Sequence, residues 1–430
     1  MCADMRGHDP LTMIAEIIAA GSEMLTPHRQ DTNSLFLTAQ LNDLGVEVAF
    51  KTIVGDSLDH LTGAARNALR RVDIVLFSGG LGPTEDDLTR EAAAAALGVS
   101  LYRNPNLLDG LQRRFAARDM EMPPNNAKQA DVLEGATVLS NPVGSAPGQL
   151  LDTVVDGYRK LVILLPGPPR ELKPLFTEVV KPLLSAILPP RYLARRVLRM
   201  PLIPESLVDA RTAPIYQQYT DVQTTILAGQ GEIQLHFTSS KPTLEEAQAR
   251  VDEIASRIEA EMQDAIFSSQ GESLEEVVLL MLEMRHLTLA TAESCTGGVL
   301  AERLTAVPNS SRAFVGGVVV YTPELKTRFT DVPEVMIKNY GAVSPEVARA
   351  LAEGIRARTG ASLGISTTGL AGPGGGAFGP DFEKPIGRVY LGLADGRETH
   401  IKELNLNGDR ETIRWWASQH ALDLIRRNLL

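Results

Sequence analysis

Cysteine is nearly absent from this chain, which has only Cys2 and Cys295 among 430 residues. Two thiols can build neither a disulfide framework nor a cysteine zinc cluster, and this usage is typical of a reducing cytoplasm. Long apolar runs are missing too. Glu16 interrupts the apolar stretch at 13–20, and no segment approaches the ~20 apolar residues of a membrane span. We therefore expect a cytoplasmic protein without a membrane partner.

Basic residues are also scarce. The chain has 42 Lys and Arg residues and 53 Asp and Glu residues, which gives a net charge of -11. Nonspecific affinity for nucleic acid comes from clustered Lys and Arg, so this balance argues against a general nucleic-acid binder. Apolar residues make up 44% of the chain. A chain of this length and composition can bury large cores and is expected to form two to four domains.

The N-terminal part, residues 12–188, alternates between strand-like and helix-like patterns. The expected elements are strands at 14–20, 46–54 and 73–77 and helices at 32–44 and 58–70. Such a βαβαβ series is expected to wind into a parallel sheet with helices on both faces. Loops rich in Gly and Pro at 78–89, 141–148 and 165–171 converge on one edge of this sheet, where we predict a ligand pocket.

The loop at 78–89, SGGLGPTEDDLT, has the residues of a phosphate site. Its glycines free backbone N–H groups to cradle a phosphate, and a helix expected to start near Asp87 adds its positive end. Asp86 and Asp87 supply hard oxygen ligands for a divalent metal that would neutralise a pyrophosphate. On this loop alone, the alternative that the two carboxylates only cap the helix is equally compatible.

A second α/β domain is expected over residues 271–430. Ser273 and Glu276 form a capping box at the start of its first helix. The expected helices are 274–284, 298–304, 345–358 and 410–427, and the expected strands are 286–291, 314–321, 361–366 and 387–394.

The stretch TAESCTGG, residues 291–298, joins a buried strand to a helix and places Ser294 at the strand exit. Its glycines allow close approach of a ligand, and unpaired helix N–H groups can stabilise an oxyanion. A serine needs a base, and Lys326, partly stripped of water, can be neutral enough to serve. No histidine lies in a Gly-x-Ser-x-Gly turn, so Ser-Lys chemistry is favoured over Ser-His-Asp. Cys295 is the rival nucleophile, although such a thiol is more often a small buried residue.

Six motifs follow one another over roughly residues 272–430: AESCTGG, GGVVVYTPELK, GAVSPEVA, TGLAGPGGG, EKPIG and GDR. Together they resemble the nicotinamide-nucleotide amidohydrolase domain, the C-terminal part of the CinA (competence/damage-inducible protein A) family. GSEML, DTN, GGLGPTEDDLT, PPNNAKQA, NPVGSAPG and LPGPPRE resemble the N-terminal domain of the same family, which is related to molybdopterin-binding folds. The resemblance implies two α/β domains, 12–188 and 271–430, joined by a small α+β, KH-like module at 189–270.

For the C-terminal domain, the resemblance implies hydrolysis of nicotinamide mononucleotide to nicotinate mononucleotide and ammonia without a cofactor. Ser294 would attack the amide carbon, Lys326 would take its proton, and Tyr321 would relay protons or hold Lys326 in place. The implied substrate contacts are backbone N–H groups of Thr296, Gly297 and Gly298 on the oxyanion, Thr368 and Gly369 on the nucleotide, and Arg410 on its phosphate. Residues 376–383 are longer than expected for the family, which leaves substrate preference open.

For the N-terminal domain, the resemblance implies an ADP-ribose pyrophosphatase that needs a divalent metal. Asp87 would be the leading metal ligand, with Asp86 beside it. The implied pocket residues are Glu23, Asn33, Asp86, Asp87, Thr89 and Glu171, with Gly79, Gly80, Gly144 and Ser145 on the phosphates. In GSEML, Ser22 stands where the family commonly has threonine, which keeps the hydroxyl.

The middle segment has short strands expected at 197–202, 223–227 and 232–238 and helices from Glu205 and at 243–264. Four arginines at 191, 195, 196 and 199 raise the question of whether this segment binds nucleic acid. However, Gly229-Gln230-Gly231 lacks the two-residue spacing of a KH clamp loop, and no stacking aromatics accompany the arginines. We expect a spacer or dimerisation role.

The expected partners are thus small nucleotides, nicotinamide mononucleotide and ADP-ribose, and a second copy of the chain in a homodimer. Two alternatives from other functional classes stay open. The N-terminal half could be only a pterin- or nucleotide-binding module, or the whole chain could be a competence-associated scaffold that recruits another protein or DNA.

Overall fold

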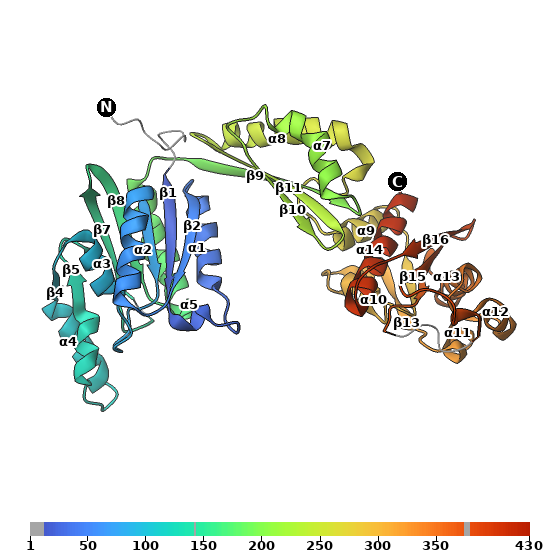
Figure 1. Cartoon of the computed structure of the whole chain (residues 1–430), viewed down its shortest axis with the longest axis horizontal. Coiled ribbons are helices and arrows are strands. Elements are labelled where there is room, and N and C mark those ends of the chain that lie inside the picture. The colour runs from blue at the N-terminus through green and yellow to red at the C-terminus, as the bar shows by residue number, and fades with distance from the viewer. Residues whose placement is uncertain (1–12, 142, 374–378) are drawn as a thin grey trace. The chain divides into compact units, whose positions relative to one another are not determined.

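The structure is a computed structural model that describes residues 13–141, 143–373 and 379–430 (Figure 1). The chain forms two compact units. The first holds Met1–Ala194 and Ser239–Ala249, and the second holds Arg195–Thr238 and Arg250–Leu430. Among the described residues, no helix is both long enough and apolar enough to cross a membrane.

The first unit is built on a six-stranded sheet with the order β2-β1-β3-β8-β7-β6. Its strands are β1 (Ile14–Ala20), β2 (Glu47–Val54), β3 (Ile74–Ser78), β6 (Thr137–Leu139), β7 (Gly148–Val155) and β8 (Tyr158–Leu165). β2, β1, β3 and β8 run parallel, in agreement with the predicted βαβαβ series.

One edge of the sheet in the first unit, outside the predicted βαβαβ series, is not parallel, because β7 pairs antiparallel with both β8 and β6. Only Asp156 and Gly157 separate β7 from β8, and both have positive φ, 51° and 83°. A two-residue turn of this kind closes a hairpin and leaves no room for a crossover helix.

Helices cover both faces of the sheet in the first unit, as predicted, and give it a core on each side (Figure 1). Every residue of β1 is buried. Its one charge, Glu16, is held by Arg71 at 2.7 and 2.9 Å and by the Thr52 hydroxyl at 2.6 Å. The helices are α1 (Thr32–Asp43), α2 (Leu58–Arg71), α3 (Thr89–Leu97), α4 (Pro105–Ala116), α5 (Pro169–Leu175) and α6 (Lys181–Ile187), and β4 (Leu101–Arg103) pairs with β5 (Asp131–Leu133).

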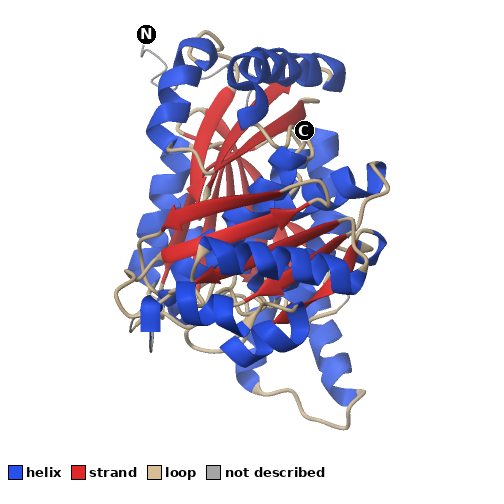
Figure 2. Ribbon diagram, turned by 90° about the vertical axis from the view of Figure 1, so that its right-hand side faces the viewer, coloured by secondary structure: helices blue, strands red, loops and turns tan. Residues whose placement is uncertain are grey.

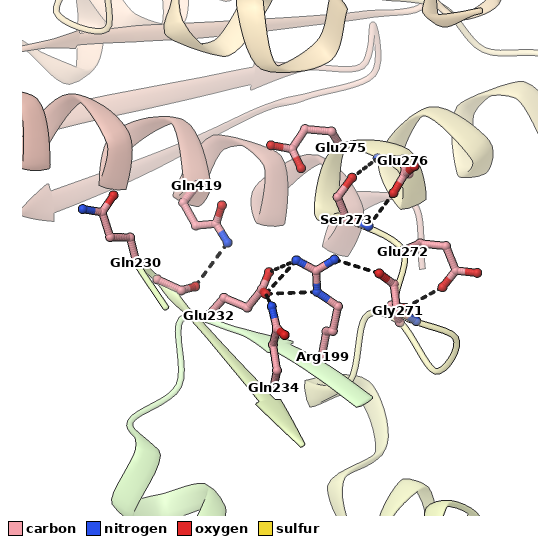
Figure 3. Close-up of polar contacts among 12 residues, drawn as sticks. Arg199, Gln230, Glu232, Gln234, Gly271, Glu272, Ser273, Glu275, Glu276 and Gln419 are labelled. Carbon is pink, nitrogen blue, oxygen red and sulfur yellow. Dashed lines mark hydrogen bonds and ion pairs between the residues drawn. The ribbon is translucent and has the colours of Figure 1, made fainter. Parts of the chain in front are cut away.

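The middle segment forms a three-stranded sheet with the order β10-β11-β9, and its predicted strands and helices are confirmed. The elements are β9 (Tyr192–Pro201), α7 (Glu205–Tyr216), β10 (Gln223–Gly229), β11 (Glu232–Lys241) and α8 (Leu244–Met262). Two of the arginines that raised the question of nucleic acid are paired with carboxylates. Arg196 contacts Asp252 at 3.1 Å. Arg199 contacts Glu232 at 2.7 and 2.9 Å, as Figure 3 shows.

The C-terminal domain has a five-stranded sheet with the order β13-β12-β14-β15-β16. Its strands are β12 (Leu289–Glu293), β13 (Phe314–Val319), β14 (Leu363–Gly369), β15 (Arg388–Ala394) and β16 (Thr399–Asn405). β12 is parallel to both β13 and β14, whereas β15 and β16 continue the sheet antiparallel. The sequence did not predict β16.

Helices flank the strands of the C-terminal domain as well (Figure 2). α9, α10 and α14 bury one large core, and α11 and α13 contribute to another. The predicted capping box is confirmed, because Ser273 and Glu276 exchange side-chain-to-backbone bonds of 3.3 and 2.6 Å. The helices are α9 (Leu274–Met284), α10 (Val299–Thr305), α11 (Pro323–Thr330), α12 (Glu334–Tyr340), α13 (Pro345–Thr359) and α14 (Arg410–Asn428).

Candidate functional site

The turn that carries Ser294 leaves the central strand β12 and leads into α10. The Ser294 N–H donates to the carbonyl of Thr367 on β14 at 2.8 Å, and the Thr296 and Thr367 hydroxyls lie 2.6 Å apart. Gly297 and Gly298 both have positive φ, 60° and 98°, a conformation that glycine adopts without strain. The fold therefore fixes Ser294 at the strand exit, almost buried.

Lys326 comes from α11 and lies directly against the serine. Its Nζ is 2.7 Å from Ser294 Oγ and donates to the Val320 carbonyl at 2.7 Å. The side chain is only 1% exposed, and this burial lowers the pKa of Lys326 from 10.5 to about 8. The amine is therefore neutral in a large fraction of molecules near pH 8 and can accept the proton of a serine hydroxyl.

Cys295 has the opposite electrostatic setting. Burial raises the pKa of its thiol to about 11, and the side chain belongs to the core of the C-terminal domain. Only a thiolate is an efficient nucleophile, so at neutral pH this thiol is poorly suited to attack.

Glu293, the last residue of β12, is a site residue that the sequence analysis missed. Its buried carboxylate accepts the N–H groups of Gly298 at 2.9 Å, Leu300 at 3.1 Å and Ala301 at 2.8 Å. The Gly297 N–H donates to the Ser294 carbonyl at 3.1 Å. The expectation that the amides of Gly297 and Gly298 bind an oxyanion is therefore wrong. A carboxylate in the turn region shortly before a helix start was the available signal, since helix N-termini attract negative charge.

Arg410, at the first position of α14, donates to the Tyr321 hydroxyl at 2.7 Å and to the Gly372 carbonyl at 2.8 Å. Tyr321 was expected to relay protons or to hold Lys326, but its hydroxyl pairs with Arg410 and its side chain is 55% exposed, so only the proton relay stays a prediction. The group that holds Lys326 is the Val320 carbonyl. Arg410 therefore joins α14 to the segment that follows β13.

Arg414, one helical turn after Arg410, is a second residue that the sequence analysis missed. Its Nε and Nη2 donate to the Thr296 carbonyl at 3.0 and 2.8 Å. Residues four apart on a helix share one face, so the spacing from Arg410 was a usable signal.

The predicted nucleotide contacts at Thr368 and Gly369 lie at the end of β14. Thr368 is fully buried, and its hydroxyl donates to the Ala342 carbonyl at 2.7 Å. A Cβ on Gly369 would lie 2.6 Å from Val389, so packing closes that side. Whether these two residues touch a nucleotide stays a prediction.

The long segment at 376–383 is only partly described, because residues 374–378, which include the last glycines of TGLAGPGGG, lie outside the described residues. Its described end is tied down by Asp381. This buried carboxylate accepts the N–H groups of Ala342 at 2.7 Å and Val343 at 3.2 Å and pairs with Lys384 at 2.8 Å.

The first unit has a cavity of about 620 Å³ where its three Gly/Pro-rich loops meet. Of the predicted pocket residues, the structure places these in its lining: Glu23, Asn33, Gly79, Gly80, Asp86, Asp87, Ser145 and Glu171. Thr89 and Gly144 are not in the lining. The buried Thr89 hydroxyl donates to the Gly79 carbonyl at 2.8 Å, and Gly144 packs so closely on Glu171 that a Cβ would collide with its carboxylate.

Asp87 does not cap α3, which begins at Thr89 without a side-chain cap. Its Oδ2 accepts the Thr84 N–H at 2.9 Å and the Thr84 hydroxyl at 2.5 Å, so one carboxylate oxygen is committed to the loop. No three His, Cys, Asp or Glu residues among those described converge as a ready metal cage. Magnesium commonly binds through one or two carboxylates and the phosphates of its substrate, and Asp86 and Asp87 fit that arrangement.

Three family models match the chain one after another. The probable molybdopterin binding domain matches residues 16–186, the damage-inducible protein CinA KH domain matches 195–268, and the CinA C-terminal domain matches 271–429. Among solved structures, a CinA protein with unknown function from Thermoplasma acidophilum is 34% identical and covers 40% of this chain and 98% of its own, with a TM-score of 0.36.

Whole-length relatives extend these matches. A CinA-like protein of Acidobacterium capsulatum is 58% identical over 418 residues, which are 97% of this chain and all of that protein. A putative competence-damage inducible protein of Moorella thermoacetica is 42% identical over 419 residues, 97% of this chain and 99% of that one. With the three family domains in order and such identity over nearly its whole length, the chain belongs to the CinA family.

Proposed function

We propose that the C-terminal domain is a serine amidohydrolase that converts nicotinamide mononucleotide and water to nicotinate mononucleotide and ammonia. The observation that carries this proposal is the 2.7 Å contact between Ser294 Oγ and the buried Lys326 Nζ, together with the pKa of Lys326 lowered to about 8. A hydroxyl and a neutral amine at this distance form a nucleophile and base that need no metal. The choice of substrate follows from the family resemblance.

In the first half of the reaction, neutral Lys326 takes the hydroxyl proton as Ser294 Oγ bonds to the carboxamide carbon. The negative charge that develops on the carboxamide oxygen needs fixed N–H donors. We assign this role to the amides of Cys295 and Thr296, because those of Gly297 and Gly298 are engaged within the turn. The C–N bond then breaks, Lys326 returns its proton to the nitrogen, and ammonia leaves a nicotinoyl ester on Ser294.

In the second half, Lys326 takes a proton from water, and the hydroxide oxygen attacks the ester carbon. The bond to Ser294 Oγ breaks, the serine oxygen recovers the proton from Lys326, and nicotinate mononucleotide is released. Arg410 would contact the substrate phosphate while its bond to Tyr321 keeps it at the site.

This function predicts a defined stoichiometry. With a chelator present, the protein should release ammonia and nicotinate mononucleotide in equal amounts from nicotinamide mononucleotide. Nicotinamide riboside, which lacks the phosphate, should have a KM at least about tenfold higher because it loses a charge-assisted contact. Release of free nicotinamide would contradict the proposal, because that product requires cleavage of the glycosidic bond.

A second activity is favoured by the cavity of the first unit. We propose that the first unit cleaves the pyrophosphate of ADP-ribose, because glycine-rich backbone and carboxylates line its cavity of about 620 Å³. A divalent cation, when bound, would neutralise charge on the pyrophosphate. Asp86 and Asp87 would hold the cation, and Gly79 and Gly80 would leave room for the phosphates.

Asp87→Asn should lower metal-dependent cleavage of ADP-ribose by about 100-fold or more, because the amide keeps the shape but loses the negative charge that binds the cation. The products AMP and ribose 5-phosphate can be separated by chromatography. Glu85→Gln is the matched control, since Glu85 is exposed and lies outside the cavity lining. Unchanged turnover in Asp87→Asn would contradict the metal assignment, and binding of ADP-ribose by wild type without cleavage would favour the binding-module alternative.

A further inference from the structure

The two-residue turn Gln230-Gly231 lies between β10 and β11 of the middle segment. It contacts α14, the helix that carries Arg410 and Arg414. The Trp415 Nε1 donates to the Gln230 carbonyl at 3.1 Å. The Gln419 side chain points toward the same turn (Figure 3), and its Nε2 donates to the Gly231 carbonyl at 3.2 Å. Both carbonyl groups of the turn are therefore bound by α14.

The same stretch of α14 contacts the turn at residues 294–298 that carries Ser294, which we call the nucleophile turn. Arg414, next to Trp415, makes the two bonds to the Thr296 carbonyl. The Ser294 N–H is bound to Thr367, so the amides of Cys295 and Thr296 lie in a segment held at both ends. Displacement of α14 would release one of these ends.

The buried Arg303 links α10 to the Gln230-Gly231 turn through Gln419 of α14. Arg303 of α10 donates to Ser418 at 2.7 Å and to Gln419 at 2.6 Å, and its guanidinium lies 4.1 Å from the centre of the Trp415 ring. Gln419 thus bonds to the turn through its nitrogen and to Arg303 through its oxygen. Because α10 begins at Val299, directly after Gly298, both helices that flank the nucleophile turn are linked to Gln230-Gly231.

Arg199 provides a second attachment beside the turn (Figure 3). It pairs with Glu232, the residue after the turn, and donates to the Gly271 carbonyl at 2.9 Å, just before α9. On α9, Glu275 pairs with Arg303. The bond from Arg199 to the Gly271 carbonyl therefore ties the end of the β10–β11 hairpin to the segment before α9, and the Glu275–Arg303 pair ties α9 to α10.

A cavity of about 400 Å³ lies between the Gln230-Gly231 turn and these helices. Gln230 lines it together with Val299 of α10 and Arg410, Arg414 and Trp415 of α14. The middle segment therefore supplies part of the wall of a space whose other walls belong to the helices around the nucleophile turn.

We propose that the Gln230-Gly231 turn is a positioning element of the amidase site, a role different from that of a spacer. It fixes α14 so that Arg414 holds the Thr296 carbonyl. The N–H groups of Cys295 and Thr296 then stay oriented toward the oxyanion. Fixed donors stabilise a transition state only while they are held in place, so a small displacement is costly. The inference rests on the proposed amidase function.

Two neighbouring glycines give a matched pair of variants. Gly231 has φ +74°, and a Cβ there would lie 3.0 Å from Gln419 and 3.4 Å from Trp416. At Gly229, which ends β10, the nearest atom to a Cβ would be 3.7 Å away and no positive φ is required. Gly231→Ala should lower kcat for nicotinamide mononucleotide about tenfold with KM nearly unchanged, whereas Gly229→Ala should keep wild-type values.

Trp415→Phe is a second probe in case Gly231→Ala lowers the melting temperature as well. It removes the N–H donor to Gln230 and keeps an aromatic ring beside Arg303. A loss in kcat with an unchanged melting temperature supports the proposal, and wild-type kcat in both Trp415→Phe and folded Gly231→Ala overturns it.

A double-mutant cycle tests the route through Arg414. If the turn acts by holding Arg414 in place, Gly231→Ala should cost little more once Arg414→Met has removed the bonds to Thr296. Fully additive losses would overturn the proposal, because they would mean that the turn acts independently of Arg414.

The rate at which a fluorophosphonate labels Ser294 separates this proposal from the choice of substrate. The reagent phosphonylates the serine oxygen, fluoride leaves, and the lysine takes the proton, so no amide substrate is needed. Mass spectrometry should give about tenfold slower labelling in Gly231→Ala and Arg414→Met than in Gly229→Ala. Slower labelling without any hydrolysis of nicotinamide mononucleotide by wild type would reject the substrate and keep the positioning role, whereas equal labelling rates in all variants would overturn it.

Discussion

Ser294→Ala is expected to lower ammonia release from nicotinamide mononucleotide by about 10³-fold or more, because it removes the atom that forms the acyl intermediate. Cys295→Ser should keep turnover within about threefold of wild type, since only packing changes. The structural reason is the contrast between two adjacent residues. The Ser294 oxygen lies 2.7 Å from a lysine amine, whereas burial raises the pKa of the Cys295 thiol to about 11.

Steady-state ammonia assays on both variants check this contrast, and melting temperatures show whether each variant is folded. Ser294 is almost buried, so the alanine leaves a small space and no large loss of stability is expected. Turnover that survives in Ser294→Ala and disappears in Cys295→Ser would make the thiol the nucleophile and reject the Ser-Lys mechanism.

Lys326→Met should be as inactive as Ser294→Ala, because the hydroxyl then has no base. Wild-type kcat/KM should rise with pH and level off above about 8, where the lowered pKa of Lys326 leaves the amine neutral. Below that pH the amine is protonated, and the rate should fall about tenfold per pH unit. A pH series of initial rates measures the inflection directly.

Lys326→Arg sharpens this prediction, because a guanidinium stays protonated across the accessible range and should give no activity at any pH. Lys338→Ala is the matched control, since Lys338 is an exposed lysine on the neighbouring α12 and should leave the pH profile unchanged. An inflection near pH 8 that persists in Lys326→Met would assign it to another group and contradict the role of Lys326 as base.

Local sequence signals predicted much of the fold. Largely apolar runs marked β1 and β12, and Ser273 with Glu276 marked the start of α9, because strand burial and helix capping depend on neighbouring residues. Strand direction at the sheet edges was missed. Asp156-Gly157 is a hairpin signal and was available in the sequence, but most of β16 is partly exposed and the strand has no strong apolar pattern.

The pairing of Ser294 with Lys326 was accessible from sequence because both follow strands, β12 and β13, that run parallel and end at the same sheet edge. The bond from Arg414 to Thr296 could not be predicted from sequence, because it depends on how α14 packs against a turn 118 residues away. Thr89 was placed in the N-terminal pocket by its motif, whereas its buried hydroxyl supports the loop from behind.

Ammonia release from nicotinamide mononucleotide, measured with a chelator at pH 8.5 for wild type, Ser294→Ala and Lys326→Met, tests the central claim most directly. We predict turnover in wild type and loss in both variants, with no requirement for a metal. Absence of ammonia from folded wild type, or turnover that survives in either variant, would contradict a Ser-Lys amidase acting on this nucleotide.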